Sequence, residues 1–321
     1  MRVSVEPLDD LMHVPDEDST YNESAYASYA DPDRRLGGFM RLGNRVHEGF
    51  AEVTVCVYLP DGRIAFWYTR APITNNDAHD AGGLRFDVAQ TRTEYIVEYD
   101  GPMVILDDPS QMEDPKRAFT SNPQAHGKII LRTRPTSPLI HPWDESQFAK
   151  AHTEQNMLVS GTVTVGDLTF QLENAYGVRD RSWGPRDWHH FKWHRWLTMS
   201  FGPDFGLVLF TTAVGDEPEQ VRGYVHHGPD GDPQQIVAAS VDTDYDGHTY
   251  AKSARVHVVT ADGSELDIEG EAWSTIPLRH RKGSDVARLT EGLATWRTGT
   301  RTGVGLFEYF DQIIDGKRVG P

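Results

Sequence analysis

Glu52-Val53-Thr54-Val55-Cys56-Val57-Tyr58-Leu59-Pro60-Asp61-Gly62-Arg63 is the stretch that decides the fold class of this chain. Its branched apolar residues occupy every second position from Val53 to Leu59, which places them on one face of a β-strand. Pro60-Asp61-Gly62 is typical of a tight turn, and a second strand-like segment follows over residues 63–69. The stretch therefore predicts an antiparallel β-hairpin.

The same turn signal recurs along the chain, because Asp-Gly pairs stand at 100–101, 230–231, 246–247, 262–263 and 315–316. Short alternating segments lie between these turns, and each predicts a strand: 91–99, 157–165, 168–172, 206–213, 255–260 and 304–310. Helical character is confined to one short segment at 144–151. This rhythm predicts an all-β chain, a sandwich or antiparallel barrel with few short helices.

At 321 residues the chain exceeds the size at which a single core usually stops growing, so we expect two domains. Gly184-Pro185 interrupts two aromatic strand-like segments, which predicts domains at 1–184 and 185–321. The Pro-rich, acidic stretch up to Arg35 lacks strand periodicity and is expected to be irregular. Residues between Met103 and Ile129 are expected to form a long surface loop or lid.

The charge balance narrows the classes of partner, because 31 basic against 48 acidic residues give a net charge of −17. Such a chain repels phosphate backbones and anionic lipid surfaces, so nucleic acid is not an expected partner. The sequence has no run of about 18 apolar residues and no signal-peptide pattern, so we expect a cytoplasmic protein without stable membrane insertion. Its lone Cys56 is expected to be a small core residue.

Cofactor motifs are missing from the sequence. There is no glycine-rich dinucleotide fingerprint, no phosphate-binding loop and no nucleophile elbow, so no cofactor is predicted. His190 and His194 would share a strand face, but Lys192 lies between them and its charge opposes a divalent cation. No metal site is predicted from this cluster.

The densest group of chemically capable residues runs from Tyr176 to Trp196 and includes Asp180. If the chain is extended here, Asp180 points into a barrel while Arg179 and Arg181 point outward. An Asp among Trp and Val side chains would lose solvation, stay protonated near neutral pH and act as a general acid. Alternatively, Asp180 caps a turn or pairs with a neighbouring arginine as part of the architecture.

The sequence allows two compatible roles for Trp183, Trp193 and Trp196. Clustered tryptophans in a β protein usually belong to the core. If they line a cavity instead, their ring faces would hold an apolar ligand and stabilise a developing carbocation.

The segment Arg179-Asp180-Arg181-Ser182-Trp183-Gly184 and the Trp-rich strand after it resemble the family that joins carotenoid hydratases (hydroxyneurosporene synthases) to AttH-like tandem lipocalin proteins. The β rhythm, the chain length and the closing region at 308–316 are similar to that family too. The resemblance implies two consecutive lipocalin-like barrels and, for the hydratases, cofactor-free proton chemistry at an alkene.

Asp180 matches the proton donor of these hydratases, and His152 stands where they have an important histidine. Where they have an aromatic residue two positions after that histidine this chain has Glu154, and where they have Tyr two positions before the Asp it has Val178. The implied function is a hydratase, dehydratase or double-bond isomerase for a hydrophobic, terpenoid or steroid-like molecule. Its predicted ligand contacts are Trp183, Trp193, Trp196, Tyr176 and Glu154.

Two other functions stay open at this point. A lipocalin-like barrel can bind a hydrophobic molecule without catalysis, because a fold does not fix a function. A scaffold or assembly factor with a barrel filled by side chains is the third possibility.

Overall fold

The computed structural model describes residues 10–141, 151–247 and 250–321. Of this structure 67% is strand and 5% is helix, which confirms the predicted all-β class. The strands form two antiparallel sheets, and each sheet closes on itself through a pairing between distant members. The fold is therefore two consecutive lipocalin-like barrels, as predicted.

The first barrel follows the chain strand by strand and is closed by the β1–β10 and β4–β7 pairings. Its strands are β1 (Tyr21–Asp31), β2 (Leu36–Arg45), β3 (Phe50–Tyr58), β4 (Ile64–Pro72), β7 (Glu94–Leu106), β8 (Gln124–Pro135), β9 (Ala151–Val165) and β10 (Leu168–Pro185). The hairpin of β5 (His79–Ala81) and β6 (Leu84–Gln90) extends the sheet along β7. In the described part of the chain, three short helices connect strands: η2 (Val46–Glu48), η3 (Pro109–Glu113) and α1 (Pro115–Ser121).

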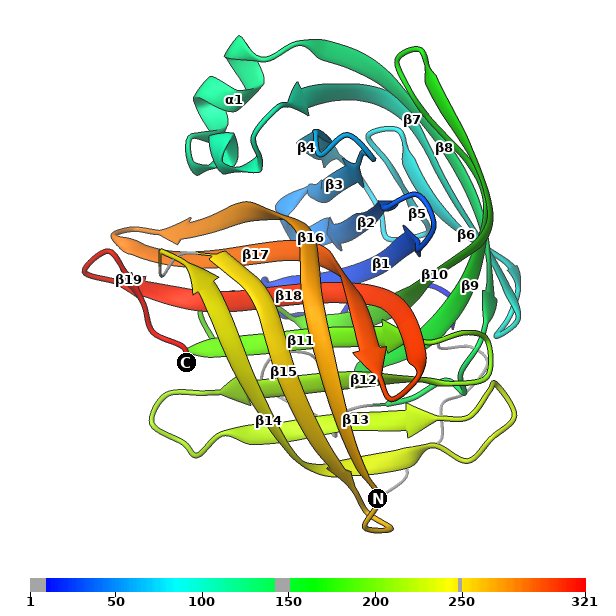
Figure 1. The fold of residues 1–321 in the computed structure, drawn as a ribbon. Coiled ribbons are helices and arrows are strands. Elements are labelled where there is room, and N and C mark those ends of the chain that lie inside the picture. Colours follow the sequence, from blue (N-terminus) through cyan, green and yellow to red (C-terminus); the bar gives the residue numbers. More distant parts are fainter. Residues whose placement is uncertain (1–9, 142–150, 248–249) are drawn as a thin grey trace.

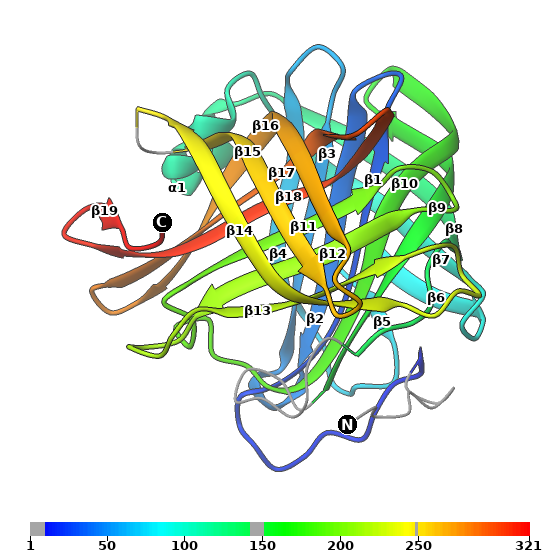
Figure 2. The same cartoon turned by 60° about the horizontal axis from the view of Figure 1, so that its bottom comes forward.

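The second barrel repeats this simple order and is closed by the pairing of β11 with β18. Its strands are β11 (Trp193–Ser200), β12 (Gly206–Ala213), β13 (Gln220–His226), β14 (Gln234–Asp246), β15 (Tyr250–Thr260), β16 (Glu265–Lys282), β17 (Asp285–Thr298) and β18 (Arg301–Ile314), with β19 (Lys317–Arg318) added at its edge. Figure 1 shows β17 and β18 beside β1 and β2 in the middle of the molecule, and in Figure 2 the strands of the two barrels cross. A domain boundary at 184/185 stays a prediction.

Strand alternation divides the buried side chains into three clusters. Val53, Val55 and Val57 of β3 fill the first barrel, as the opening stretch of sequence predicts. The interior of the second barrel holds residues such as Leu207 and Phe307. The third cluster lies between the barrels and takes Cys56 and Tyr58 from the other face of β3. Both faces of β3 are therefore buried, one inside its barrel and one against the second barrel.

The barrels approach each other closely at Gly37 of β2. A Cβ atom there would lie 2.3 Å from Cδ1 of Leu293 on β17 and 2.5 Å from the Tyr29 carbonyl oxygen. Only glycine leaves room for this contact. Nearby, the rings of Tyr26 and Trp196 lie 5.3 Å apart across the same interface.

Two sequence-based expectations about irregular segments are wrong. The stretch before Arg35 contains β1, whose residues are all buried; its small and polar residues hid a strand that has no solvent face. The segment between Met103 and Ile129, predicted as a long surface loop or lid, is not a long loop: it holds the ends of β7 and β8 and the two short helices η3 and α1. Asp108-Pro109 and Asp114-Pro115 each supply an N-cap followed by proline, and that signal was overlooked.

The predicted helix at 144–151 lies outside the described residues except for Ala151, which begins β9. The hairpin at Pro60-Asp61-Gly62 is confirmed, with Gly62 at φ 91° between β3 and β4. The predicted strand at 206–213 coincides with β12. Among the described residues, no helix has the length and apolar character needed to cross a bilayer.

Candidate functional site

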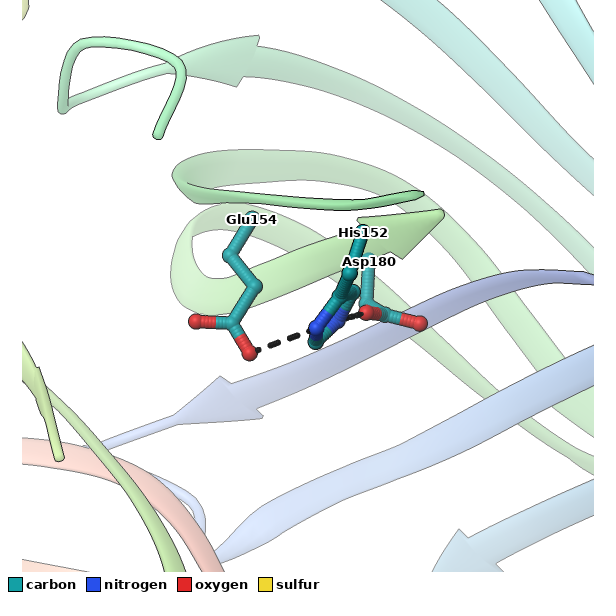
Figure 3. Close-up of side chains that lie close together, drawn as sticks. All are labelled: His152, Glu154 and Asp180. Carbon is teal, nitrogen blue, oxygen red and sulfur yellow. Dashed lines mark hydrogen bonds and ion pairs between the residues drawn. The ribbon is translucent and has the colours of Figure 1, made fainter. Parts of the chain in front are cut away.

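The register of β9 and β10 builds a compact group of three ionisable side chains. Asp180 stands opposite Glu154, and Ser182 stands opposite His152, so all these side chains share one face of the sheet. The His152 Nε2 atom is hydrogen-bonded to Asp180 Oδ2 and lies 3.5 Å from Glu154 Oε1. Figure 3 shows the imidazole ring between the two carboxyl groups.

This group faces a cavity of about 90 Å³ between the two barrels. The first barrel and the linker after it line one side with Ser24, Tyr26, Arg41, His152, Glu154, Asp180, Ser182, Arg186 and Trp188. The second barrel and the residues leading into β11 line the other with Phe191, His194, Trp196, Phe210, Leu289, Glu291 and Glu308. The site is therefore assembled from both barrels instead of lying inside either one.

The predicted direction of Asp180 is wrong. It points away from the interior of the first barrel, and the flanking arginines point into the mouth of that barrel. There Arg179 binds Asp10 at 2.6 Å, and Arg181 binds Glu23 at 2.6 Å. The two arginines next to Asp180 in sequence are thus committed to other carboxylates.

Electrostatics at the site favour a protonated Asp180. Burial raises the pKa of Asp180 to about 7, against the lowering effect of the Arg186 and Arg41 charges, and Glu308 adds to the rise. Burial also holds the pKa of His152 well below its usual range, with further lowering from Arg186. The pair consists of a carboxyl that titrates near neutral pH and a neutral imidazole.

Glu154 is the most isolated of the three groups. Burial, followed by the charges of Asp180 and Glu308, raises its pKa well above the ordinary value. Neither of its carboxyl oxygens has a hydrogen bond of good geometry among the described residues, and a side-chain contact with Trp196 only partly opposes the rise in pKa. A buried polar group of this kind gains most from a bound water or ligand.

The second barrel contributes two buried carboxyl groups that sequence reasoning missed. Glu308 of β18 accepts a 2.8 Å hydrogen bond from His194 Nε2 if that nitrogen is protonated, and Glu291 of β17 accepts one of 2.5 Å from Tyr26. Burial raises the pKa of Glu308 to about 8 and that of Glu291 well above its ordinary value. A charged residue within the apolar alternation of 304–310 was the available signal for Glu308.

A second, larger cavity of about 240 Å³ adjoins the first. The two cavities share Arg41, Trp188, Leu289 and Glu291 in their linings. The apolar lining includes Phe39, Phe66, Met112, Pro115, Phe119, Pro277, Leu278, Ala287 and Phe310. Helices η3 and α1 thus cover part of this cavity, and Glu113 of η3 contacts Arg279 and Tyr250 of the second barrel.

The other predicted site residues lie in different places. Trp196 lines the 90 Å³ cavity together with Asp180, His152 and Glu154. Trp183, Trp193 and Tyr176 line neither of the two cavities between the barrels. Trp183 stacks on His13, with ring centroids 3.9 Å apart, and Trp193 packs against Arg195.

His152, Glu154 and Asp180 are also the one group of possible metal ligands among the described residues, with donor atoms within 4.8 Å of one another. One imidazole and two carboxylates are donors that a transition metal accepts. Arg186 and Arg41 already place positive charge beside Asp180, however, and a divalent cation would be repelled by both. The donor set fits a metal poorly, and we derive no reaction step through one.

Fold and site together define a tandem lipocalin-like protein with a buried acid–base cluster between its barrels. The chain belongs to the family described as "Domain of unknown function (DUF7064)", which matches residues 6–313. No curated protein matches the sequence.

Solved structures with the same fold span nearly the whole chain. A protein described as AttH from Nitrosomonas europaea has a TM-score of 0.67 at 14% identity and covers 99% of this chain and 98% of its own. CghA, solved with Sch210972, has a TM-score of 0.59 at 12% identity, with 91% and 88% covered. Kievitone hydratase from Nectria haematococca has a TM-score of 0.59 at 9% identity, with 91% and 89% covered. The predicted resemblance to AttH-like tandem lipocalin proteins is confirmed at the level of the fold.

Proposed function

We propose that this protein is a cofactor-independent hydratase, dehydratase or double-bond isomerase that acts on a hydrophobic molecule between its barrels. Asp180 is the general acid in this proposal, and His152 is its partner. The observation that carries the proposal is the largely buried Asp180 carboxyl, which is hydrogen-bonded to His152. Burial raises its pKa to about 7. A catalytic acid works best when its pKa lies near the working pH.

The chemistry follows from the positions of these groups. For hydration, the π electrons of an alkene take the proton of Asp180 as its O–H bond breaks, which leaves a carbocation. The ring faces of Trp196 and Phe210 line the cavity and stabilise that charge. Water then adds to the cation, and His152 accepts the released proton and returns it to Asp180. Dehydration reverses these steps, and isomerisation replaces water addition by proton loss from a neighbouring carbon.

The cavities support a substrate with an apolar body. The 240 Å³ cavity would hold that body, and the 90 Å³ cavity would hold the reacting atoms next to Asp180. Together they fall at the lower end of the ~300–1,000 Å³ typical of ligand pockets. A terpenoid or steroid-like molecule has the required apolar surface. Kievitone hydratase and CghA, which was solved with Sch210972, share this fold. Both names support a small molecule as the substrate of the present protein.

A cytoplasmic location, the absence of a nucleic-acid partner and the absence of a cofactor remain our predictions for the protein. The acidic balance of 48 Asp and Glu against 31 Lys and Arg is the observation behind the second of these.

Binding without catalysis is the second candidate. The lining of the 240 Å³ cavity is mostly apolar, and such a pocket retains a ligand by burial alone. In that function Asp180 would only contribute to ligand affinity, and its conversion to Asn would leave the bound molecule chemically unchanged.

The deciding experiment compares the wild-type protein with Asp180→Asn by native mass spectrometry after purification from the source organism. We expect a retained hydrophobic molecule that the wild type has converted and that the variant holds unconverted. If both proteins carry the same unaltered molecule, the binding function replaces the catalytic one. If neither carries any small molecule, the enclosed-ligand idea is contradicted.

Turnover is then measured with stated probes, namely linalool, farnesol and kievitone, by chromatography of the products. Loss of a positioned general acid lowers the rate by about 10²–10⁴-fold. We expect that loss in Asp180→Asn with unchanged circular dichroism. Arg179→Gln is not a suitable control because Arg179 is buried against Asp10. Asp87→Asn is suitable, because the Asp87 side chain is 47% exposed.

A further inference from the structure

The wall of the cavity opposite Asp180 carries acid–base groups of its own. Glu308 and Glu291 come from β18 and β17 of the second barrel, and both line the 90 Å³ cavity together with Asp180 and Glu154. Trp196 stands directly opposite Glu308 in the β11–β18 pairing. Four buried carboxyl groups therefore surround one small space, two from each barrel.

These carboxyl groups exceed the positive charge available to them. The cations that act on them within the cavity lining are Arg41 and Arg186. Glu308 and Asp180 influence each other through space, because Glu308 favours the protonated form of Asp180. Like charges in a small buried site cannot all be held at once, so such carboxyl groups share protons.

His194 fixes the position of Glu308. The His194 ring lies 2.8 Å from Glu308 Oε1 and stacks on Phe310 with centroids 4.9 Å apart. Burial lowers the pKa of His194 to about 3, so the ring stays neutral and acts through its hydrogen bond. This arrangement mirrors His152 and Asp180 on the other wall.

We propose that Glu308 is a second catalytic acid–base residue, and that a substrate between the barrels gains a proton from one wall and loses a proton to the other. This inference rests on the proposed function and extends it to the second barrel. His194 is the positioning residue for Glu308, as His152 is for Asp180.

The proton balance closes within the cavity. In isomerisation, the O–H bond of Asp180 breaks as a C–H bond forms at one end of the alkene. A C–H bond at the neighbouring carbon then breaks, its electrons form the new double bond, and Glu308 takes the proton. Because the pKa of Glu308 is about 8 and that of Asp180 about 7, this step uses the fraction of molecules in which Glu308 is ionised and Asp180 is protonated. Proton exchange of both carboxyl groups with solvent restores that state for the next cycle. In hydration, Glu308 in place of His152 takes the proton from the attacking water, and the role of His152 is then to position Asp180.

This placement has a stereochemical consequence. Because donor and acceptor lie on opposite walls, a flat substrate gains and loses its protons on opposite faces. Products formed in D₂O should therefore carry deuterium and the new hydroxyl on opposite faces of the former double bond.

The charged and titratable groups that face Glu308 come from every element packed around the cavity. They are His194 of β11, Glu291 of β17, Tyr26 of β1, Arg41 of β2, Tyr58 of β3, Glu154 of β9, Asp180 of β10, and Arg186 after β10. Any of them can change the titration of Glu308, so the test compares variants with one another.

The first test is infrared spectroscopy of the wild-type protein, which follows the carbonyl stretch of protonated carboxyl groups from pH 5 to pH 9. We expect carboxyl groups that are still protonated at neutral pH and that lose their protons in more than one step, as coupled groups do. Glu308→Gln should remove one step and move the Asp180 step to lower pH. An Asp180 step that does not move in Glu308→Gln would overturn the proposal.

Turnover of the linalool, farnesol or kievitone probe supplies the second test. Glu308→Gln should lower the rate by at least about 100-fold. The shorter carboxyl in Glu308→Asp should restore part of it, and the exposed Glu269→Gln should leave it unchanged. A rate unaffected by Glu308→Gln but lost in Asp180→Asn would overturn this inference and leave the proposed function intact. If Asp180→Asn has no effect, the proposed function itself fails. Should neither Glu308 variant fold, the product that the wild type forms in D₂O decides the question: deuterium and hydroxyl on the same face would overturn the proposal.

Discussion

The two faces of β10 carry buried ionisable residues of opposite character. On the face toward the interior of the first barrel, Arg179 and Arg181 each bind one carboxylate, Asp10 and Glu23. On the face toward the second barrel, Asp180 lies among Glu154, Glu291 and Glu308, where carboxyl groups outnumber cations. We call Arg179, Arg181, Asp10 and Glu23 the balanced cluster, because each cation has its own carboxylate. Asp180, Glu154, Glu291 and Glu308 form the unbalanced cluster, because their carboxyl groups outnumber the cations beside them.

The difference appears directly in the titration of the two carboxyl types. Burial alone would raise the pKa of Glu23, but hydrogen bonding to His13 and the Arg181 charge lower it to about 2. The pKa of Asp180 rises to about 7. A paired carboxylate stabilises the fold, whereas a carboxyl that is left neutral at some energetic cost is available for proton transfer.

The largest expected effect on stability is at the balanced cluster. Glu23→Gln keeps the shape of the side chain but leaves the Arg181 charge buried without its partner, which costs about 3–5 kcal/mol. Urea denaturation measures this loss. Asp180→Asn is the matched change on the other face and should cost far less, because burial already favours the neutral form of Asp180. Equal losses in the two variants would remove the distinction between the faces.

The two faces should also give opposite pH dependence of stability. The folded pKa of Asp180, about 7, is above its unfolded value, so its contribution is complete below about pH 4 and is lost as the pH rises through 7. The folded pKa of Glu23 is depressed, so its contribution is present above about pH 4 and is lost as the pH falls toward 2.

Thermal unfolding from pH 2 to pH 9 separates the two contributions. Asp180→Asn should flatten the decline in melting temperature between pH 5 and pH 8 and leave the acid limb unchanged. Glu23→Gln should flatten the acid limb alone. A variant that alters both limbs equally would show that the clusters are coupled through β10.

The fold was largely predictable because local patterns carry it. The alternation at 53–59 and the turn at Pro60-Asp61-Gly62 predict β3 and β4. The strand β1 was missed because both of its faces are buried, so its sequence shows no contrast between an apolar face and a polar one. Where two barrels pack against each other, the outer face of a strand is buried too. The sequence of that strand then no longer alternates between apolar and polar residues, so the alternation cannot be used to predict it.

The site was predictable only in part. The residues of one cavity wall lie close together in the sequence, whereas those of the other wall are far from them in the sequence. Asp180, His152 and Glu154 lie on adjacent strands, and the resemblance to the hydratases pointed to them. Glu291 and Glu308 reach the same cavity from more than 100 residues further along the chain, through packing of one barrel on the other. Single-sequence reasoning contains no rule for that packing, and it also assigned Asp180 to the wrong side of its strand.

Trp196→Phe tests the aromatic lining of the 90 Å³ cavity, and its effect on the rate of turnover should be smaller than that of Asp180→Asn. A tryptophan face stabilises a nearby cation by about 0.5–2 kcal/mol, so partial loss should slow turnover about 2–30-fold. The phenyl ring of the variant preserves most of the buried apolar surface. Rates measured with the same probes, alongside binding of the unreacted probe, distinguish loss of cation stabilisation from loss of affinity. An equal drop in binding and in rate would assign Trp196 to ligand affinity instead.

The smallest effect on turnover is expected for Trp183→Phe, which changes the same residue type on the opposite side of the sheet. Trp183 stacks on His13 and lines neither cavity between the barrels, so its replacement should act on stability through the loss of an aromatic contact, by about 0.5–1.5 kcal/mol. Changes at sites without shared partners are independent to within ~0.3–0.5 kcal/mol, which limits the change in rate to about twofold. Turnover that falls as far in Trp183→Phe as in Trp196→Phe would mean that the reacting molecule reaches the mouth of the first barrel, and the separation of the two faces of β10 would then fail.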